Sequence, residues 1–308
     1  MSDWSLIGVR FALYFALAAL FGLSAFSLYG LQAHQRSDAL ALRPWLLGSA
    51  IFSLLFSIGW LVLTASSMAG TPLWPIDREA IGGLLTSSAV GAAWKLRVVA
   101  LVIAAVAAMF AARRGLLLSL VMLASGVALA TLPWTGHGAM DEGAGGWVHL
   151  AADVLHLIAS GAWIGALLGL LLLVSRPAAQ VDAAHLDLTH RALHGFGTVG
   201  TIVVVTVVVT GLVNAWMLVG IGNVSALATT LYGQLLIAKL ALFVAMLGLA
   251  SLNRFRLTPA FEQSIASADH RGALGALRNS LAAETACVVV ILGLVAWLGT
   301  LAPPSSAM

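Results

Sequence analysis

Residues 147–174 read WVHLAADVLHLIASGAWIGALLGLLLLV, a run that is long and apolar enough to cross a lipid bilayer as one helix. A rotation of about 100° per residue places five of its side chains within a sector of roughly 80°. These side chains are His149, Asp153, His156, Ser160 and Trp163. Ionisable groups at membrane depth are energetically costly, so we interpret this polar face as part of a functional site.

A second face of the same segment carries a glycine at every fourth position. Gly161, Gly165 and Gly169 follow this spacing. Small residues at such intervals allow another helix to approach closely. We therefore expect the helix to be buried in a bundle, with its polar face turned toward an interior site.

The composition of the whole chain indicates a membrane protein. Its 308 residues are 61% hydrophobic and only 9% charged, whereas a soluble domain would carry about 25% charged residues. The net charge of +3 is explained by arginines that set membrane topology, so no nucleic-acid partner is expected. The single cysteine, Cys287, excludes an internal disulfide or a thiolate cluster, which leaves nitrogen, oxygen and thioether ligands for a metal.

Apolar runs predict an all-α, polytopic protein that consists of a bundle of eight transmembrane helices. The predicted spans are residues 6–31, 45–68, 91–112, 115–133, 147–174, 197–220, 231–251 and 280–302. We expect one integral membrane domain over residues 1–308. A weak internal repeat suggests the halves 1–134 and 135–308, because Gly91 and Arg97 recur as Gly233 and Lys239 after a shift of 142 residues.

The arginines outside the predicted spans indicate the orientation. Lysine and arginine are retained on the cytoplasmic side of a membrane. If both termini are periplasmic, the outer segments hold only Arg78. The inner loops then hold Arg36, Arg43, Arg113, Arg114, Arg176, Arg191, Arg254, Arg256, Arg271 and Arg278. The bias is decisive, so both termini are predicted to be periplasmic.

Side chains that can bind a metal concentrate toward the periplasmic face. His137 and Met140 precede the central helix, and His149, Asp153 and His156 continue down it. In the sixth predicted helix, Met217 lies beyond a stripe on the same face. This stripe consists of Thr206, Thr210 and Asn214. Imidazole with thioether suits Cu(I), and imidazole with carboxylate suits Cu(II), so the predicted ion is copper in either state.

The spacing of the histidines predicts two sites rather than one. His149 and His156 are separated by two helical turns, or about 10 Å, so one ion would not bind both unaided. We expect a mouth site formed by His137, Met140 and His149. A deeper site would combine Asp153 or His156 with a partner from another helix.

Each candidate also has a simpler explanation. Asp153 could form an intramembrane ion pair with Arg97 or Lys239. These two cations, together with Asn214, are candidates for gating or charge pairing rather than ligation. Isolated methionines usually serve packing. A further polar group on the cytoplasmic side is either an inner receiving site or a solvated loop. It comprises Asp182, His185, Asp187, His190 and His194.

Several stretches resemble the copper resistance protein D (CopD) family of bacterial inner-membrane proteins. They are GHGAMDEGAGGWVHL at 136–150, VLHLIASGAWIGALLGL at 154–170, TGLVNAW at 210–216 and LATTLYGQLLIAKLALFVAMLGLASLNRF at 227–255. The resemblance implies eight membrane helices and copper handling at His137, His149, Asp153 and His156, with Lys239 and Asn253 as family-like positions of unassigned role. It also implies a separate periplasmic copper-binding partner of the CopC type, since the chain has no fused domain of that kind.

These observations together predict a copper resistance protein of the bacterial inner membrane. It would accept copper at a periplasmic-side site, move the ion into the cytoplasm and catalyse no reaction. Two alternatives stay open. One is a b-type haem or quinone electron-transfer protein, which would need imidazoles facing each other from different helices. The other is a copper sensor or docking protein that binds the ion without transporting it.

Overall fold

The computed structural model describes residues 4–33, 35–36, 40–111, 115–135, 143–266 and 271–307. Within these ranges, eight helices are long and apolar enough to cross a membrane. They are α1 (Trp4–Gly30), α3 (Leu42–Ala69), α5 (Ala89–Phe110), α6 (Gly115–Ala130), α7 (Gly143–Val174), α8 (Ala183–Val219), α10 (Leu231–Leu252) and α12 (Arg271–Leu298). The predicted all-α bundle with eight spans is confirmed.

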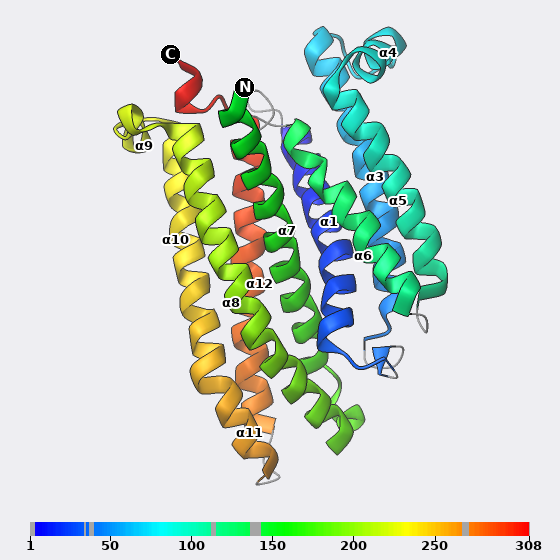
Figure 1. Cartoon of the computed structure of the whole chain (residues 1–308), viewed down its shortest axis with the longest axis vertical. Coiled ribbons are helices and arrows are strands. Elements are labelled where there is room, and N and C mark those ends of the chain that lie inside the picture. Colours follow the sequence, from blue (N-terminus) through cyan, green and yellow to red (C-terminus); the bar gives the residue numbers. More distant parts are fainter. Residues whose placement is uncertain are drawn as a thin grey trace.

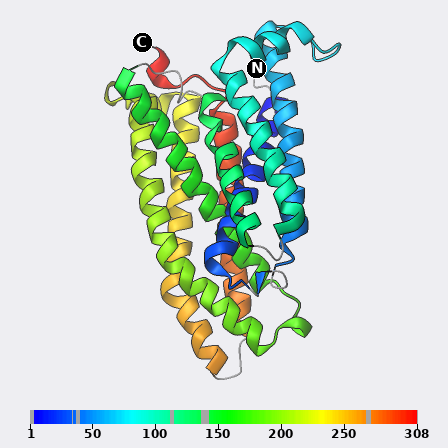
Figure 2. The same ribbon diagram turned by 45° about the vertical axis from the view of Figure 1, so that its right-hand side comes forward.

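The helices form two groups on either side of α1 (Figures 1 and 2). Helices α3, α5 and α6 lie on one side, and α7, α8, α10 and α12 lie on the other. Helix α1 packs on α3, α6, α7 and α12, so it joins the groups. Both chain termini lie at one end of the bundle, here called the upper end, and the opposite end is the lower end. Which end faces the periplasm stays a prediction.

Glycines explain why α1 can occupy the centre. A Cβ atom built on Gly165 of α7 would overlap the backbone of Gly22 in α1, and a Cβ on Gly169 would overlap the Phe26 ring. The two backbones therefore approach more closely than any side chain would allow. The predicted close approach through the glycine face of α7 is confirmed.

Two of the helices extend beyond the predicted spans. Helix α8 begins at Ala183 rather than near residue 197, and α12 begins at Arg271 rather than near 280. Asp182 starts α8 as an N-cap, because its Oδ1 accepts a hydrogen bond from the His185 amide at 2.8 Å. Hydropathy marks only the apolar part of a helix, so it missed these polar first turns.

The two proposed halves share one local structure. Ser88 caps α5 by accepting from the Gly91 amide, and Thr230 caps α10 by accepting from the Gly233 amide. In each case a short helix precedes the cap, α4 (Arg78–Ser87) or α9 (Ala226–Thr229), and its backbone lies against the glycine. These junctions are consistent with the repeat, which stays a prediction.

Candidate metal-binding site

The polar face of α7 turns inward in the upper half of the bundle. His149 is buried, with 1% of its surface exposed, and its Nε2 lies 3.9 Å from Oδ2 of Asp153, one turn below. His156 follows on the same face and is half-buried. The three side chains that the helical period placed together therefore do form one interior group.

Helix α8 supplies the polar partners of this group. Asn214 Nδ2 donates a hydrogen bond to Asp153 Oδ1 at 2.6 Å, and Thr210 Oγ1 lies 3.0 Å from Nδ1 of His156. Thr210 and Asn214 are one turn apart, so both face α7, and both are buried. Gly211 lies beside the imidazole, since a Cβ there would be in ordinary van der Waals contact with it, 3.5 Å from Cε1 of His156.

Met217 and Lys239 lie at the edges of the group. The Met217 Cε methyl lies 3.9 Å from the position of a Cβ on Gly145, in the first turn of α7, so the thioether is near the upper end of the site. Lys239 of α10 interacts electrostatically with Asp153 and with His156. Of the two cations considered for Asp153, the structure therefore places Lys239 near it.

Arg97 is held elsewhere. Its Nε donates to Thr131 Oγ1 at 2.8 Å and its Nη2 donates to the Thr131 carbonyl oxygen at 3.2 Å. The guanidinium carbon lies 5.8 Å from the centre of the Trp60 ring. No ion pair joins Arg97 to Asp153, so the alternative in which these two residues neutralise each other does not hold.

The predicted mouth site consists mostly of residues outside the described ranges. His137 and Met140, with Asp141 and Glu142, lie outside the described residues. Among the described residues, no three His, Cys, Asp or Glu side chains lie close enough together to hold one metal ion. The described part of the site therefore consists of two contacts between α7 and α8, Asp153 with Asn214 and His156 with Thr210. A complete metal site would need further ligands.

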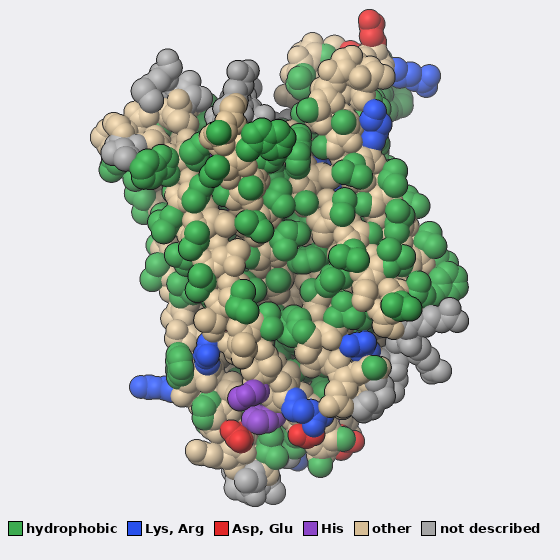
Figure 3. All heavy atoms as spheres, viewed as in Figure 1, with side chains coloured by type: hydrophobic (Ala, Val, Ile, Leu, Met, Phe, Trp, Pro, Cys, Tyr) green, Lys and Arg blue, Asp and Glu red, His purple; other side chains and the backbone are tan. Residues whose placement is uncertain are grey.

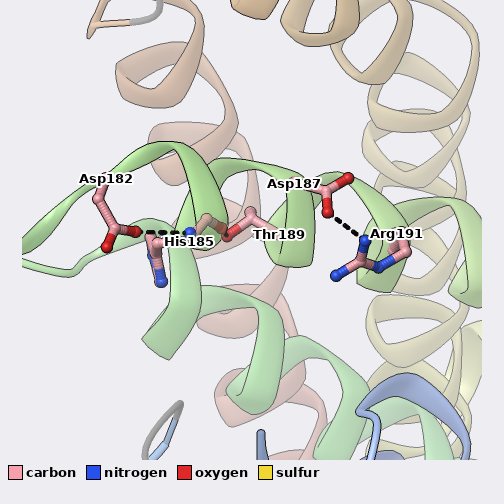
Figure 4. A network of polar contacts seen from close by, with 5 residues as sticks. All are labelled: Asp182, His185, Asp187, Thr189 and Arg191. Atoms are coloured by element: carbon pink, nitrogen blue, oxygen red, sulfur yellow. Dashed lines mark hydrogen bonds and ion pairs between the residues drawn. The ribbon is translucent and has the colours of Figure 1, made fainter.

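Most of the polar residues at the lower end have structural partners (Figure 4). Asp182 caps α8, and Asp187 pairs with Arg191 one turn along the same helix. The His185 ring is buried, with Nε2 3.0 Å from the Leu173 carbonyl oxygen and Nδ1 3.1 Å from Arg176 Nη1. Asp182, His185 and Asp187 therefore do not converge on a receiving site. Of the predicted group, His190 and His194 remain as candidates for one.

Sequence reasoning missed two acidic residues in the lower half. Glu284 of α12 is buried and Glu262, in α11 (Thr258–Ala266), lies beside His190. The signal that could have identified Glu284 is a single carboxylate inside the otherwise apolar segment AAETACVVVILGLV.

The hydrogen bond between Asn214 and Asp153 gives a first prediction. Replacing Asn214 by leucine removes the donor that orients the Asp153 carboxylate, and loss of such an orienting partner typically lowers metal affinity by about 10–100-fold. Thr206→Val is the matched control, since Thr206 is half-buried on the same stripe and its side chain bonds only within its own helix. Chelator competition measures both affinities, and equal values would exclude Asp153 as a ligand.

The fold and the site define a class: a helical membrane protein with an imidazole and carboxylate group buried between its spans. Comparison with known proteins identifies the family. Residues 1–147 match the family model described as copper resistance protein D-like, N-terminal domain, and residues 190–298 match copper resistance protein D. The chain belongs to the copper resistance protein D family, a group of copper resistance and transport proteins, and is a multi-pass protein of the inner membrane.

Three curated relatives show how far the likeness extends. Copper resistance protein D of Pseudomonas syringae pv. tomato is 44% identical over 100% of this chain and 99% of its own length. Inner membrane protein YebZ of Escherichia coli (strain K12) is 28% identical over 70% of this chain and 71% of its own length. Copper transport protein CutJ of Bacillus subtilis (strain 168) is 33% identical over 41% of this chain and 22% of its own length. No solved structure matches the chain.

Proposed function

We propose that this protein accepts copper at the upper end of α7 and moves it through the bundle to the cytoplasm. The observation that carries the proposal is the interior contact set of α7 and α8. In it, His149 lies beside Asp153, Asn214 bonds to Asp153, and Thr210 contacts His156. Polar side chains arranged this way at membrane depth typically mark the path of an ion. The family supplies the identity of that ion.

The charge distribution supports an orientation in which the lower end faces the cytoplasm. Basic side chains, together with acidic ones and histidines, gather at the lower end of the face in Figure 3, below a broad hydrophobic surface. Arginines are retained in the cytoplasm, so the lower end is the cytoplasmic end in this proposal. The upper end, with Met217 and His149, then faces the periplasm and is the side that meets the incoming ion.

Each residue of the site has a chemical role. The imidazoles of His149 and His156 and the thioether of Met217 supply ligand atoms that suit copper. Asn214 orients the Asp153 carboxylate, which supplies negative charge. Lys239 balances that charge when no ion is bound, and its repulsion of a bound cation favours release over permanent retention.

A periplasmic copper-binding protein of the CopC type is the proposed donor. The ion would be transferred to the mouth site, which includes His137 and Met140, before it reaches His149. Transfer from a carrier suits a mouth site with few fixed ligands, because an incoming ion must leave its carrier and enter the bundle in stages. Copper is therefore the cargo of this protein, in either the Cu(I) or the Cu(II) state.

Copper flux distinguishes a transporter from a sensor. Proteoliposomes that contain the purified chain are expected to accumulate radiolabelled copper faster than protein-free liposomes, and the variant with both His149→Ala and His156→Ala should fall to the protein-free rate. Asp187→Asn, at the opposite end, serves as the control and should keep the accumulation rate of the unmodified chain. Copper binding without accumulation by the unmodified chain would replace the transport proposal with the sensor.

A further inference from the structure

The lower half of the second helix group contains a cavity of about 600 Å³. Residues of α7, α8, α10, α11 and α12 line it, together with the π-helical turn Asn253–Leu257 that links α10 to α11. Its volume falls in the range of about 300–1,000 Å³ that is typical of ligand sites. The upper site does not use this cavity, so its purpose needs a separate explanation.

Two buried polar side chains contribute to the cavity wall. Glu284 is 1% exposed and Asn253 is 7% exposed, and the Asn253 amide nitrogen donates a hydrogen bond to Glu284 Oε1. Glu284 forms no ion pair with any described residue, and Asn253 Oδ1 has no hydrogen-bond partner among them. A buried carboxylate without a counter-charge is costly, and the unused amide oxygen beside it adds a second electron-rich atom. A cation would satisfy both groups.

The other ionisable groups of the cavity wall have partners of their own. His190 Nε2 lies 3.6 Å from Glu262 Oε2, which places an imidazole and a second carboxylate on the wall. Arg254 is the opposing charge, but its guanidinium donates to Thr201 Oγ1 and lies over the Phe255 ring. Both charged neighbours are thus paired with other side chains, and Glu284 is the acidic group of the wall that has no charged partner among the described residues.

Trp163 connects this cavity to the upper site. It lies on the polar face of α7, two turns or about 10 Å below His156, and it also lines the cavity. Its ring contacts the Phe243 ring of α10 edge-on, with 6.1 Å between the centroids. An ion that moves down the polar face of α7 would therefore pass these two rings and enter the cavity.

We infer that Glu284 and Asn253 form an inner cation-binding site, which receives a copper ion from the upper site before the ion leaves past His190 and Glu262. The inference rests on the proposed inward movement of copper. Mixed nitrogen and oxygen ligands suit Cu(II), so the oxygens of Glu284 and Asn253 would hold copper together with an imidazole of the same cavity wall, that of His190 or His194. The site would thus hold copper between its release from the upper histidines and its exit from the protein.

Metal analysis of the purified full chain tests the inference. The chain in detergent is loaded with Cu(II), dialysed, and its copper content is measured by mass spectrometry, with a parallel series in Cu(I) under reducing conditions. Glu284→Gln keeps the hydrogen bond to Asn253 but removes the charge, and it is expected to lose one bound copper ion per chain. Asp187→Asn is the control, because this exposed carboxylate at the lower end does not line the cavity.

The upper-site variant separates the two proposals. His149→Ala with His156→Ala should lose the upper ion and keep the inner one, and adding Glu284→Gln should remove both. If Glu284→Gln binds as much copper as the unmodified chain, Glu284 carries a proton instead and the inference is wrong, while the upper site still stands. If the double histidine variant keeps the upper ion while Glu284→Gln loses the inner one, the proposed function fails.

A second variant guards against misfolding of Glu284→Gln. A Cβ added to Gly197, in the cavity wall, would meet nothing within 4 Å. Gly197→Trp should therefore fold, narrow the cavity and reduce the inner copper without touching the carboxylate. Full inner occupancy in a folded Gly197→Trp protein would contradict binding inside the cavity.

Discussion

Replacing Gly165 by leucine is expected to prevent the two helix groups from joining. A Cβ at this position would overlap the backbone of Gly22, and a backbone cannot move aside as a flexible side chain can. Overpacking in a core usually costs about 1–3 kcal/mol through side-chain shifts. Here all of α1 would have to move away from α7, so the loss of stability should exceed that range.

Thermal unfolding in detergent, followed by size-exclusion chromatography, measures this effect. Gly165→Leu should give little monodisperse protein and a strongly lowered melting temperature. Gly248→Leu is the matched control, because Gly248 lies in α10 with open space around it. The control should melt at or above the temperature of the unmodified chain, since glycine within a helix costs about 1 kcal/mol relative to good helix formers. Equal melting of the two variants would show that α1 and α7 do not meet at Gly165.

Changing both His149 and His156 to alanine is expected to abolish copper binding at the upper site. Loss of a residue that only orients a ligand costs about 10–100-fold in affinity, so the removal of two ligand groups should cost more. The single variants should each retain weak binding, because Asp153 and Met217 remain. Titration with Cu(I) and with Cu(II) identifies the oxidation state that the site prefers.

The folded state of the double variant needs an independent check. His149 is buried and close to Asp153, so alanine leaves a carboxylate with one partner fewer. Helical content and elution volume should match those of the unmodified chain. Undiminished copper affinity in a folded double variant would remove the imidazoles from the mechanism. A strong Soret band in the purified unmodified protein would instead favour the haem alternative.

The sequence was sufficient for features that depend on a single helix. The eight spans follow from hydropathy, and the polar and glycine faces of α7 follow from the helical period. Thr210 and Asn214 were placed on the same face as Met217, and the structure turns the two polar side chains toward His156 and Asp153.

Features that depend on which helices are neighbours could not be predicted from the sequence. The period of a helix gives the direction of a side chain but not the element that it meets, so Arg97 and Lys239 were equal candidates for Asp153. The structure holds Arg97 on Thr131 and places Lys239 near the carboxylate. Glu284 became significant only when five helices enclosed a cavity around it. The roles of His137, Met140 and Met217 as ligands stay predictions.

The length of α8 determines where a released ion would meet its acceptor. The helix has 37 residues, or about 55 Å, whereas the hydrocarbon layer is about 30 Å thick. Residues 183–196 therefore extend roughly 20 Å past the apolar portion, and His190 in this extension belongs to the cavity wall. The cavity thus extends from the apolar part of the bundle toward its polar lower end. If copper moves inward as proposed, the ion would therefore leave the protein below the apolar layer, where an acceptor dissolved in water can take it up without entering the bilayer.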